Sequence, residues 1–284
     1  MESHNPLQNY LLAAMPAEEY ARLAPRLEPV SLPHGKVLYE FNEKLKYAYF
    51  PTTATASLLC TMEDGASVEV AEVGNEGVLD VSILLGGDGA LTQGIIQTAG
   101  HGYRLPAKWL LQENDQLSSL QTLLMRYTHT LISQMAQTTG CIRRHSVEQQ
   151  FCRWLLLNFD RMNSGKLSMT QELMANMLGV RRETVTEAAG RLQEAGLISY
   201  RRGQIAVLDR TGLEEQACEC YSVVKQSFDR LRSDLVANRC HKHARPTHSH
   251  AAHIHDAHEH DMEESAPIKI IPRSVDRRRL NLYA

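Results

Sequence analysis

The pattern of apolar and polar positions divides the chain into a strand-rich first part and a helical second part. Residues 5–28 place apolar side chains at helical spacing around Pro16, which predicts two short amphipathic helices. From Val30 the pattern changes to short apolar runs separated by glycine-rich turn clusters. The runs predicted as strands are Val37–Tyr39, Tyr47–Phe50, Ala56–Cys60, Val68–Ala71 and Gly94–Gln97. Many short strands at this spacing predict a β-sandwich or jelly roll.

A long helix is predicted from Lys108 to Thr138. Apolar residues in it are spaced alternately three and four apart, at Leu117, Leu120, Leu124, Tyr127 and Leu131, and Gln134 and Thr138 continue the spacing. A heptad seam of this kind suits a parallel helix pair, so we predict that these five residues form a homodimer interface. The alternative is a helix packed against its own β-roll. Gly140 is a predicted hinge for the part of the chain that follows.

The stretch from Thr170 to Leu197 predicts two short helices joined by a tight turn at Gly179. Thr170 is the expected N-cap of the first, with Ser168 as the alternative. The second carries one apolar stripe, formed by Val185, Ala188, Ala189 and Leu192. Its polar side chains lie on the opposite side. This layout is typical of a helix-turn-helix whose second helix enters the DNA major groove, whereas the alternative is a helical hairpin with a solvated face.

The residues after the second helix strengthen the DNA-binding interpretation. Leu197 to Leu208 reads as two short strands around a turn at Arg202 and Gly203, which makes a winged helix-turn-helix. Residues 143–210 contain 11 Lys and Arg against 7 Asp and Glu, whereas residues 1–142 contain 8 against 15. The basic charge is therefore concentrated where phosphates would be contacted.

The segment GVRRETVTEAAGRLQEAGLI resembles the DNA-binding signature of the Crp/Fnr family of bacterial transcription regulators, and the resemblance covers roughly residues 7–235. It implies that Arg182 and Glu183 read base edges, by bidentate contact to guanine and by accepting from cytosine N4. Glu187 stands where many members carry an arginine, which implies a different target sequence. The resemblance also implies phosphate contacts from Thr170 and Gln171 and a wing position for Arg201 and Arg202. The expected DNA-contacting residues are completed by Arg181, Thr184, Thr186 and Arg191.

The resemblance further implies that the strand-rich part is a cyclic-nucleotide-binding-like β-roll. Members that bind cyclic AMP hold its phosphate with a Gly-Glu and an Arg-Ser/Thr-Ala cassette. Here the corresponding places read roughly Asp80-Val81 and Thr92-Gln93-Gly94, and no Lys or Arg lies between Lys46 and Arg104. Because a cyclic phosphate needs a cation, we predict no cyclic-nucleotide binding of the usual kind and leave the effector unknown.

Charge, cysteines and termini exclude several classes of protein. The 284 residues carry a net charge of −3 and contain no apolar run long enough for a transmembrane helix. The N-terminus lacks the features of a signal peptide, so a cytoplasmic protein without membrane association is expected. The six cysteines include none before Cys60, which excludes the N-terminal iron–sulfur cluster of some relatives. Cys218 and Cys220, two apart on a predicted helix, are expected to diverge, so we interpret the cysteines as free buried thiols.

A histidine-rich tail follows the predicted domains. Eight of the 13 histidines form four His-x-His pairs, at His241, His243, His248, His250, His253, His255, His258 and His260. Imidazole is a ligand for nickel, zinc and copper(II), so the tail is expected to bind such ions in vitro and to be disordered without them. A polar tail with incidental metal affinity is the alternative.

Together these patterns predict an α+β protein with six segments. They are N-terminal helices (1–28), a β-roll (29–106), a dimerisation helix (107–140), a winged helix-turn-helix domain (141–210), a C-terminal helix (211–238) and the His-rich tail (239–284). The expected function is that of a homodimeric transcription regulator, not an enzyme, that binds a palindromic DNA site and RNA polymerase. A metal-responsive protein acting through its tail is the competing hypothesis. A cupin-like metalloenzyme is disfavoured, because the roll offers only His34 and His101 and no His-x-His pair.

Overall fold

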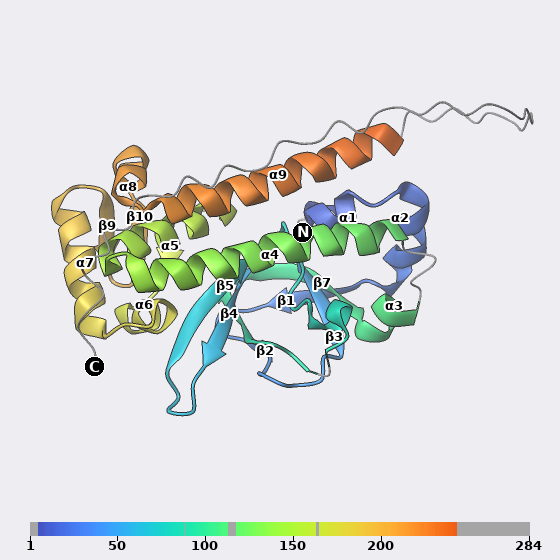
Figure 1. Cartoon of the computed structure of the whole chain (residues 1–284), viewed down its shortest axis with the longest axis horizontal. Coiled ribbons are helices and arrows are strands. Elements are labelled where there is room, and N and C mark those ends of the chain that lie inside the picture. The colour runs from blue at the N-terminus through green and yellow to red at the C-terminus, as the bar shows by residue number, and fades with distance from the viewer. Residues whose placement is uncertain (1–4, 88, 113–117, 163–164, 243–284) are drawn as a thin grey trace, which may run out of the picture. The chain divides into compact units, whose positions relative to one another are not determined.

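The computed structural model of the chain describes residues 5–87, 89–112, 118–162 and 165–242, of which the side chains of 111, 112, 118 and 237–242 are left undescribed. Its elements form an α+β protein in which a sheet domain precedes a long helix and a helical domain (Figure 1). Among the helices of the described residues, none combines the length and the apolar character needed to cross a lipid bilayer.

The N-terminal part contains two short helices and seven strands. The predicted break at Pro16 separates α1 (Tyr10–Ala13) from α2 (Ala17–Leu23). The roll strands are β1 (Glu28–Leu32), β2 (Val37–Tyr39), β3 (Tyr47–Pro51), β4 (Thr55–Thr61), β5 (Ser67–Val73), β6 (Gln93–Thr98) and β7 (Gly100–Pro106). They form antiparallel sheets in the orders β1-β7-β3 and β2-β6-β4-β5. The five predicted strands are present, whereas β1 and β7 lack an apolar run and were not predicted.

The predicted long helix corresponds to two described helices, and the predicted seam on the second faces inward. Helix α3 (Ala107–Gln112) is followed by α4 (Ser118–Arg144), which runs through Gly140 without a break. Gly140 is therefore helical, and the first non-helical residues after α4 are His145 and Ser146, while a swinging motion at Gly140 stays a prediction.

The prediction that the heptad seam forms the dimer interface is also corrected. Leu120, Leu124, Tyr127 and Leu131 are each at most 1% exposed, and they pack into the core of their own β-roll. Gln134 and Thr138 continue this buried face, and Leu117 lies outside the described residues. The reason is that the roll leaves an apolar face uncovered, and α4 covers it with its regular stripe.

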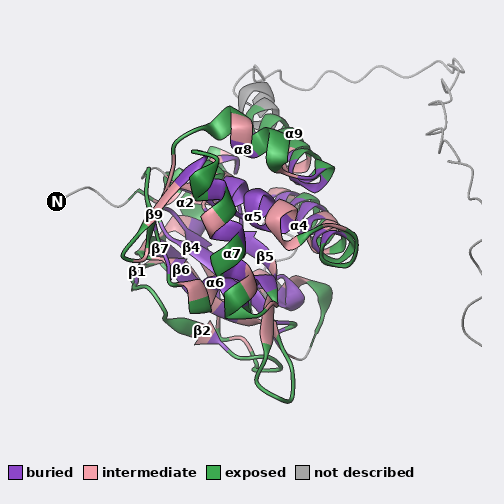
Figure 2. Cartoon of the chain, turned by 90° about the vertical axis from the view of Figure 1, so that its left-hand side faces the viewer, coloured by how far each residue is buried: buried purple, intermediate pink, exposed green. Residues whose placement is uncertain are grey.

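The C-terminal helical domain has its own core. Its elements are α5 (Val147–Arg161), β8 (Leu167–Ser168), α6 (Gln171–Leu178), α7 (Arg182–Glu194), β9 (Ile198–Arg201), β10 (Gln204–Val207), α8 (Arg210–Gln216) and α9 (Glu219–Lys242). Ser146 begins α5 with a capping box to Gln149. Phe151, Leu155 and Val185 are fully buried in this core. Most of α5 is coloured as buried in Figure 2.

The predicted single C-terminal helix is two helices, because the chain leaves the helical conformation at Ala217 and Cys218. Helix α9 then packs along α4, with Leu231 and Leu235 reaching the core of the β-roll (Figure 1).

Candidate nucleic-acid interface

Helices α6 and α7 form the predicted helix-turn-helix. Thr170 is the N-cap of α6, and its Oγ1 accepts a hydrogen bond from the Leu173 amide at 3.2 Å. Gly179 ends α6 with φ of 64°, a left-handed conformation that favours glycine. A Cβ at this position would lie 3.1 Å from Cγ2 of Val68 on β5, so the turn also sits close against the β-roll.

Helix α7 buries its predicted stripe and exposes its polar side. Val185, Ala188, Ala189 and Leu192 are at most 3% exposed. At the start of the helix, Arg181, Arg182 and Glu183 are exposed, as are Thr186 and Glu187 one turn later, whereas Thr184 is half-buried. Two arginines and a glutamate therefore lie at the exposed N-terminal end of the helix, the end whose residues contact base edges in helix-turn-helix proteins.

Several of the predicted DNA-contacting residues have partners within the protein. Thr186 Oγ1 lies 3.0 Å from Gln171 Oε1, and this contact links α7 to the start of α6. Arg191 Nε donates to Glu148 Oε2 on α5 at 2.6 Å. Arg191 must therefore exchange this exposed ion pair for a phosphate if it contacts DNA, which costs little because exposed pairs are weak.

Strands β9 and β10 form the wing, and β8 adds a third strand beside β10. Both turn residues have positive φ, 51° at Arg202 and 75° at Gly203, as a two-residue hairpin with the twist of its strands requires. Arg201 and Arg202 are exposed at this turn. The wing therefore presents two cations beside the recognition helix.

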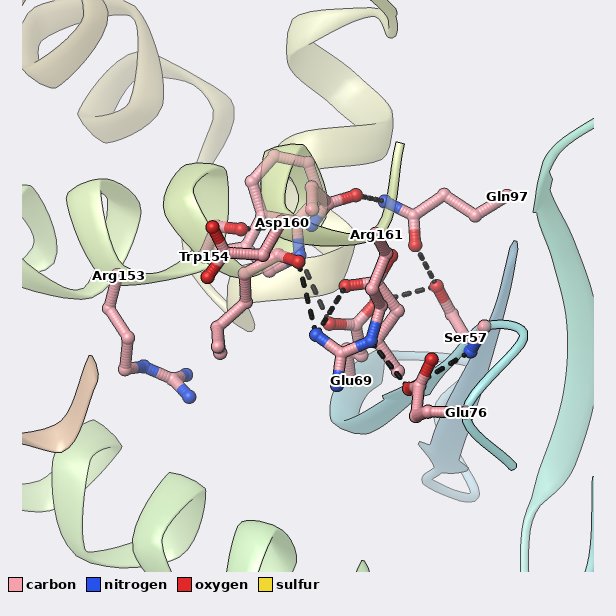
Figure 3. A network of polar contacts seen from close by, with 12 residues as sticks. Ser57, Glu69, Glu76, Gln97, Arg153, Trp154, Asp160 and Arg161 are labelled. Carbon is pink, nitrogen blue, oxygen red and sulfur yellow. Dashed lines mark hydrogen bonds and ion pairs between the residues drawn. The ribbon is translucent and has the colours of Figure 1, made fainter. Parts of the chain in front are cut away.

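A buried polar network attaches this domain to the β-roll (Figure 3). On α5, Trp154 Nε1 donates to Glu69 Oε1 on β5 at 3.0 Å, and Asn158 pairs with Gln97 on β6 at 2.6 Å. Ser57 on β4 lies 2.5 Å from both Glu69 Oε2 and Gln97 Oε1. No sequence pattern signalled this network, because its members are scattered polar residues within apolar elements.

The donors and acceptors of the network determine where its protons lie. Asn158 must turn its amide nitrogen to the Trp154 carbonyl, 2.9 Å away, so its oxygen accepts from Gln97 Nε2. Gln97 Oε1 then faces Ser57, whose single hydroxyl proton satisfies it. Glu69 Oε2 can complete the chain only by donating to Ser57 Oγ, which requires a protonated carboxyl group. Burial raises the pKa of Glu69 to about 7, in agreement with this assignment.

Arg161, at the end of α5, carries the charged part of the same interface. Its Nε donates to Glu76 Oε1 at 2.7 Å, and its Nη1 lies 3.6 Å from Glu72 Oε2. The guanidinium also packs over the Phe228 ring of α9 at 4.9 Å. Burial raises the pKa of Glu72 to about 8 in spite of the nearby arginine. Arg161 therefore joins β5, α5 and α9.

The outward face of α4 carries a second heptad pattern that the sequence interpretation missed. Met125 and Ile132 are 52% and 54% exposed, one heptad apart. The exposed positions are again spaced three and four apart, at Thr122, Met125, His129, Ile132, Ala136 and Thr139. The sequence alone did not reveal this face, because it has fewer large apolar residues than the buried heptad face of the same helix.

The region of the expected phosphate cassette holds an acid. Asp80 has φ of 59°, and its buried carboxylate accepts from the Ser82 amide at 2.7 Å. Burial raises the pKa of this carboxyl. A pocket near Ser82 is lined by Ser82, Ile83, three glycines and Lys44. Lys44 is a cation that precedes the Lys46–Arg104 interval, in which the sequence has no Lys or Arg.

The remaining predicted ligands separate into two groups. The eight tail histidines fall outside the residues whose side chains the structure describes. Cys218 and Cys220, expected to diverge, instead converge: their sulfurs lie within 4.8 Å of each other and of ligand atoms of Cys141 and His145. The prediction was wrong because Cys218 precedes the first helical residue of α9.

Comparison with known proteins matches both parts of the chain. The family model of the Crp-like helix-turn-helix domain matches residues 149–216. FixK2 from Bradyrhizobium japonicum has a similar structure, with 17% identity, a TM-score of 0.58 and coverage of 68% of this chain and 98% of that one. TTHA1359, a Crp/Fnr-family transcriptional regulator from Thermus thermophilus, is 22% identical with a TM-score of 0.56, covering 67% of this chain and 98% of its own.

A third similar structure is TTHB099, a Crp-family transcriptional regulator from the same organism, with 17% identity, a TM-score of 0.55 and coverage of 66% and 96%. No curated protein matches the sequence. The chain therefore carries a Crp-like helix-turn-helix domain on the fold of the Crp/Fnr-family transcription regulators.

Proposed function

We propose that the protein is a sequence-specific DNA-binding transcription regulator that acts as a homodimer on a palindromic site. The observation that carries the proposal is the exposed N-terminal end of α7, where Arg182 and Glu183 stand clear of the protein beside the basic wing. Arg182 would bind guanine O6 and N7, and Glu183 would accept from cytosine N4. Arg201 and Arg202 would contact phosphates, and RNA polymerase is the expected protein partner.

For the dimer we propose the outward face of α4 as the seam. Met125 and Ile132 are large apolar side chains more than half exposed on a face whose other members are small or polar, and a second copy of α4 in parallel would cover them. Two copies joined in this way would direct their recognition helices at half-sites about one helical turn apart, roughly 34 Å. The acid at Asp80 disfavours a cyclic nucleotide of the usual kind as the effector.

The base-reading role is tested by selecting bound duplexes from a random pool and then measuring affinity for the selected site. Arg182→Ala should weaken binding by about 1–3 kcal/mol and relax the preference at one base pair of each half-site. The control is Arg230→Ala, which removes the same charge from the exposed surface of α9. An Arg182→Ala protein that loses affinity equally for all sequences would assign Arg182 to the phosphates and not to the bases.

The dimer is tested with Ile132→Glu, which places two like charges in the proposed seam. We expect mass photometry to show monomers. The affinity for DNA should also fall, because a monomer has one recognition helix and contacts only one half-site. The matched control is Val223→Glu on α9, where the wild-type side chain is 43% exposed, and it should remain dimeric. A dimer that persists in Ile132→Glu and not in Val223→Glu would place the interface on α9.

A further inference from the structure

Four side chains with metal-ligating atoms meet at the junction of the long helix and the DNA-reading domain. Cys141 lies in the last turn of α4 and His145 directly follows that helix, while Cys218 and Cys220 lie on either side of Glu219, where α9 begins. The four potential ligand atoms lie within 4.8 Å of one another. The three cysteines form a separate buried cluster, and the imidazole of His145 is 18% exposed.

The local backbone explains the convergence. Cys141 and His145 are four residues apart, so they lie on one face at the end of α4. Cys218 is in the non-helical link after α8, whereas Cys220 is already helical, so their side chains can turn to the same point. Within a continuous helix the same two residues would point apart.

We propose that Cys141, His145, Cys218 and Cys220 bind a single structural zinc ion. Zinc favours four-coordinate tetrahedral sites of thiolate and imidazole, with Zn–S of about 2.3 Å and Zn–N of about 2.0 Å. Such a tetrahedron separates two sulfurs by about 3.8 Å and a sulfur from a nitrogen by about 3.5 Å. The distance from Cys141 Sγ to Cys218 Sγ is 3.5 Å, and that from Cys220 Sγ to His145 Nδ1 is also 3.5 Å.

The surroundings of the four side chains match those of a metal site. His145 Nδ1 faces the cysteines, and its Nε2 lies 3.2 Å from Glu219 Oε2, which is the carboxylate–histidine arrangement that orients a metal ligand. Gln137 Nε2 donates to Cys220 Sγ at 3.1 Å. The buried Arg153 interacts electrostatically with Cys141 and would offset the net −1 charge of three thiolates and Zn²⁺.

A disulfide or an iron–sulfur cluster explains the arrangement of the four side chains less completely than a single zinc ion does. A disulfide between Cys141 and Cys218 would leave Cys220, His145 and the His145–Glu219 pair without a common role. An iron–sulfur cluster distributes its thiolates over several irons, whereas ligand atoms this close enclose one ion. Four protein ligands leave no open position, so the ion would be structural and would fasten the end of α4 to the start of α9.

Cobalt(II) binding to the reduced full-length protein tests the site directly. Cobalt bound by cysteines gives a thiolate-to-metal charge-transfer band, which histidine ligands do not give. The His-rich tail (239–284) contains one cysteine, Cys240, so the titration is also run on Cys240→Ser, in which the tail cannot produce that band. We expect one equivalent of cobalt to produce the band and zinc to displace it. A reduced wild-type protein that shows no band would overturn the proposal, as would a Cys141–Cys218 disulfide found in protein purified without air.

Substitutions assign the ligands. Cys218→Ser should remove most of the charge-transfer intensity, and Cys60→Ser, at a half-exposed cysteine on β4, should leave it intact. In case Cys218→Ser does not fold, Glu219→Gln offers a mild test, since Glu219 is 71% exposed. It should weaken zinc binding at the thiolate site roughly 10- to 100-fold, whereas Glu215→Gln on α8 should not. Equal zinc affinity in Glu219→Gln and Glu215→Gln would reject the orienting role, and a full band in folded Cys218→Ser would reject the site.

Discussion

The proton on Glu69 makes the contact between the β-roll and α5 dependent on pH. The perturbation that isolates it is Glu69→Gln, because a glutamine amide donates to Ser57 Oγ and accepts from Trp154 Nε1, as the protonated acid does. The variant therefore keeps every hydrogen bond of the neutral network and removes only the ability to ionise.

The magnitude follows from the pKa of Glu69, which burial raises from the ordinary value of 4.5 to about 7. Between these two values the native state holds a proton that the unfolded chain has released. Stability is therefore fully present below pH 4.5 and is lost as the pH rises through 7. At 1.36 kcal/mol per pKa unit the wild type should lose up to about 3 kcal/mol over this range relative to Glu69→Gln.

The assay is the free energy of unfolding from urea titrations of both proteins at several pH values from 4.5 to 8. The charge of Glu69 contributes to the raised pKa of Glu72, about 8, so the contribution of Glu72 cancels in the difference only up to about pH 7, where Glu72 stays largely protonated in both folded proteins. Glu63→Gln, at an exposed loop carboxylate, serves as the control and should track the wild type. A difference between wild type and Glu69→Gln that stays constant across the range would refute the proton assignment.

Three further substitutions test how the domain is held and how it meets DNA. Arg161→Met should lower the free energy of unfolding by about 3–5 kcal/mol, since the Glu76 carboxylate would be left without the cation with which it pairs; a loss below about 1 kcal/mol in urea would contradict this. Gly179→Ala should destabilise by about 1 kcal/mol through its positive φ and the approach to Val68, and an unchanged urea midpoint would argue against a tight turn. Arg202→Asn keeps a residue that tolerates positive φ, so folding should be intact while the salt dependence of DNA binding decreases by about one phosphate contact; an unchanged slope would remove that contact.

Patterns with a regular period were predicted from the sequence, and contacts between distant residues were not. The α7 stripe, the Thr170 cap and the wing turn depend on local spacing and turn chemistry, and all three are present. The heptad in α4 was recognised but assigned to the wrong partner, because periodicity identifies a buried face without saying what covers it.

The Glu69 network and the Cys141–His145–Cys218–Cys220 cluster could not be found in this way. Their defining contacts, Trp154 to Glu69 and Cys141 to Cys218, join residues 85 and 77 positions apart. The cluster also depends on a short break in the helical backbone before α9. A Cys-x-Cys motif at an interrupted helix, with Cys-x-x-x-His elsewhere, was the only local signal for the cluster.

The polar residues shared by the β-roll and α5 have a consequence for chimeric proteins. An engineer who transplanted residues 146–216 onto the roll of a relative would separate Trp154, Asn158 and Arg161 from Glu69, Gln97 and Glu76. In the chimera, the Arg161 guanidinium and the Trp154 indole N–H would be buried against the recipient's β-roll without their carboxylate partners. Exchanging the helix-turn-helix domain of this protein therefore also requires transferring its partner residues on β4, β5 and β6 and Glu76 after β5, so the transferable unit is larger than the helical domain.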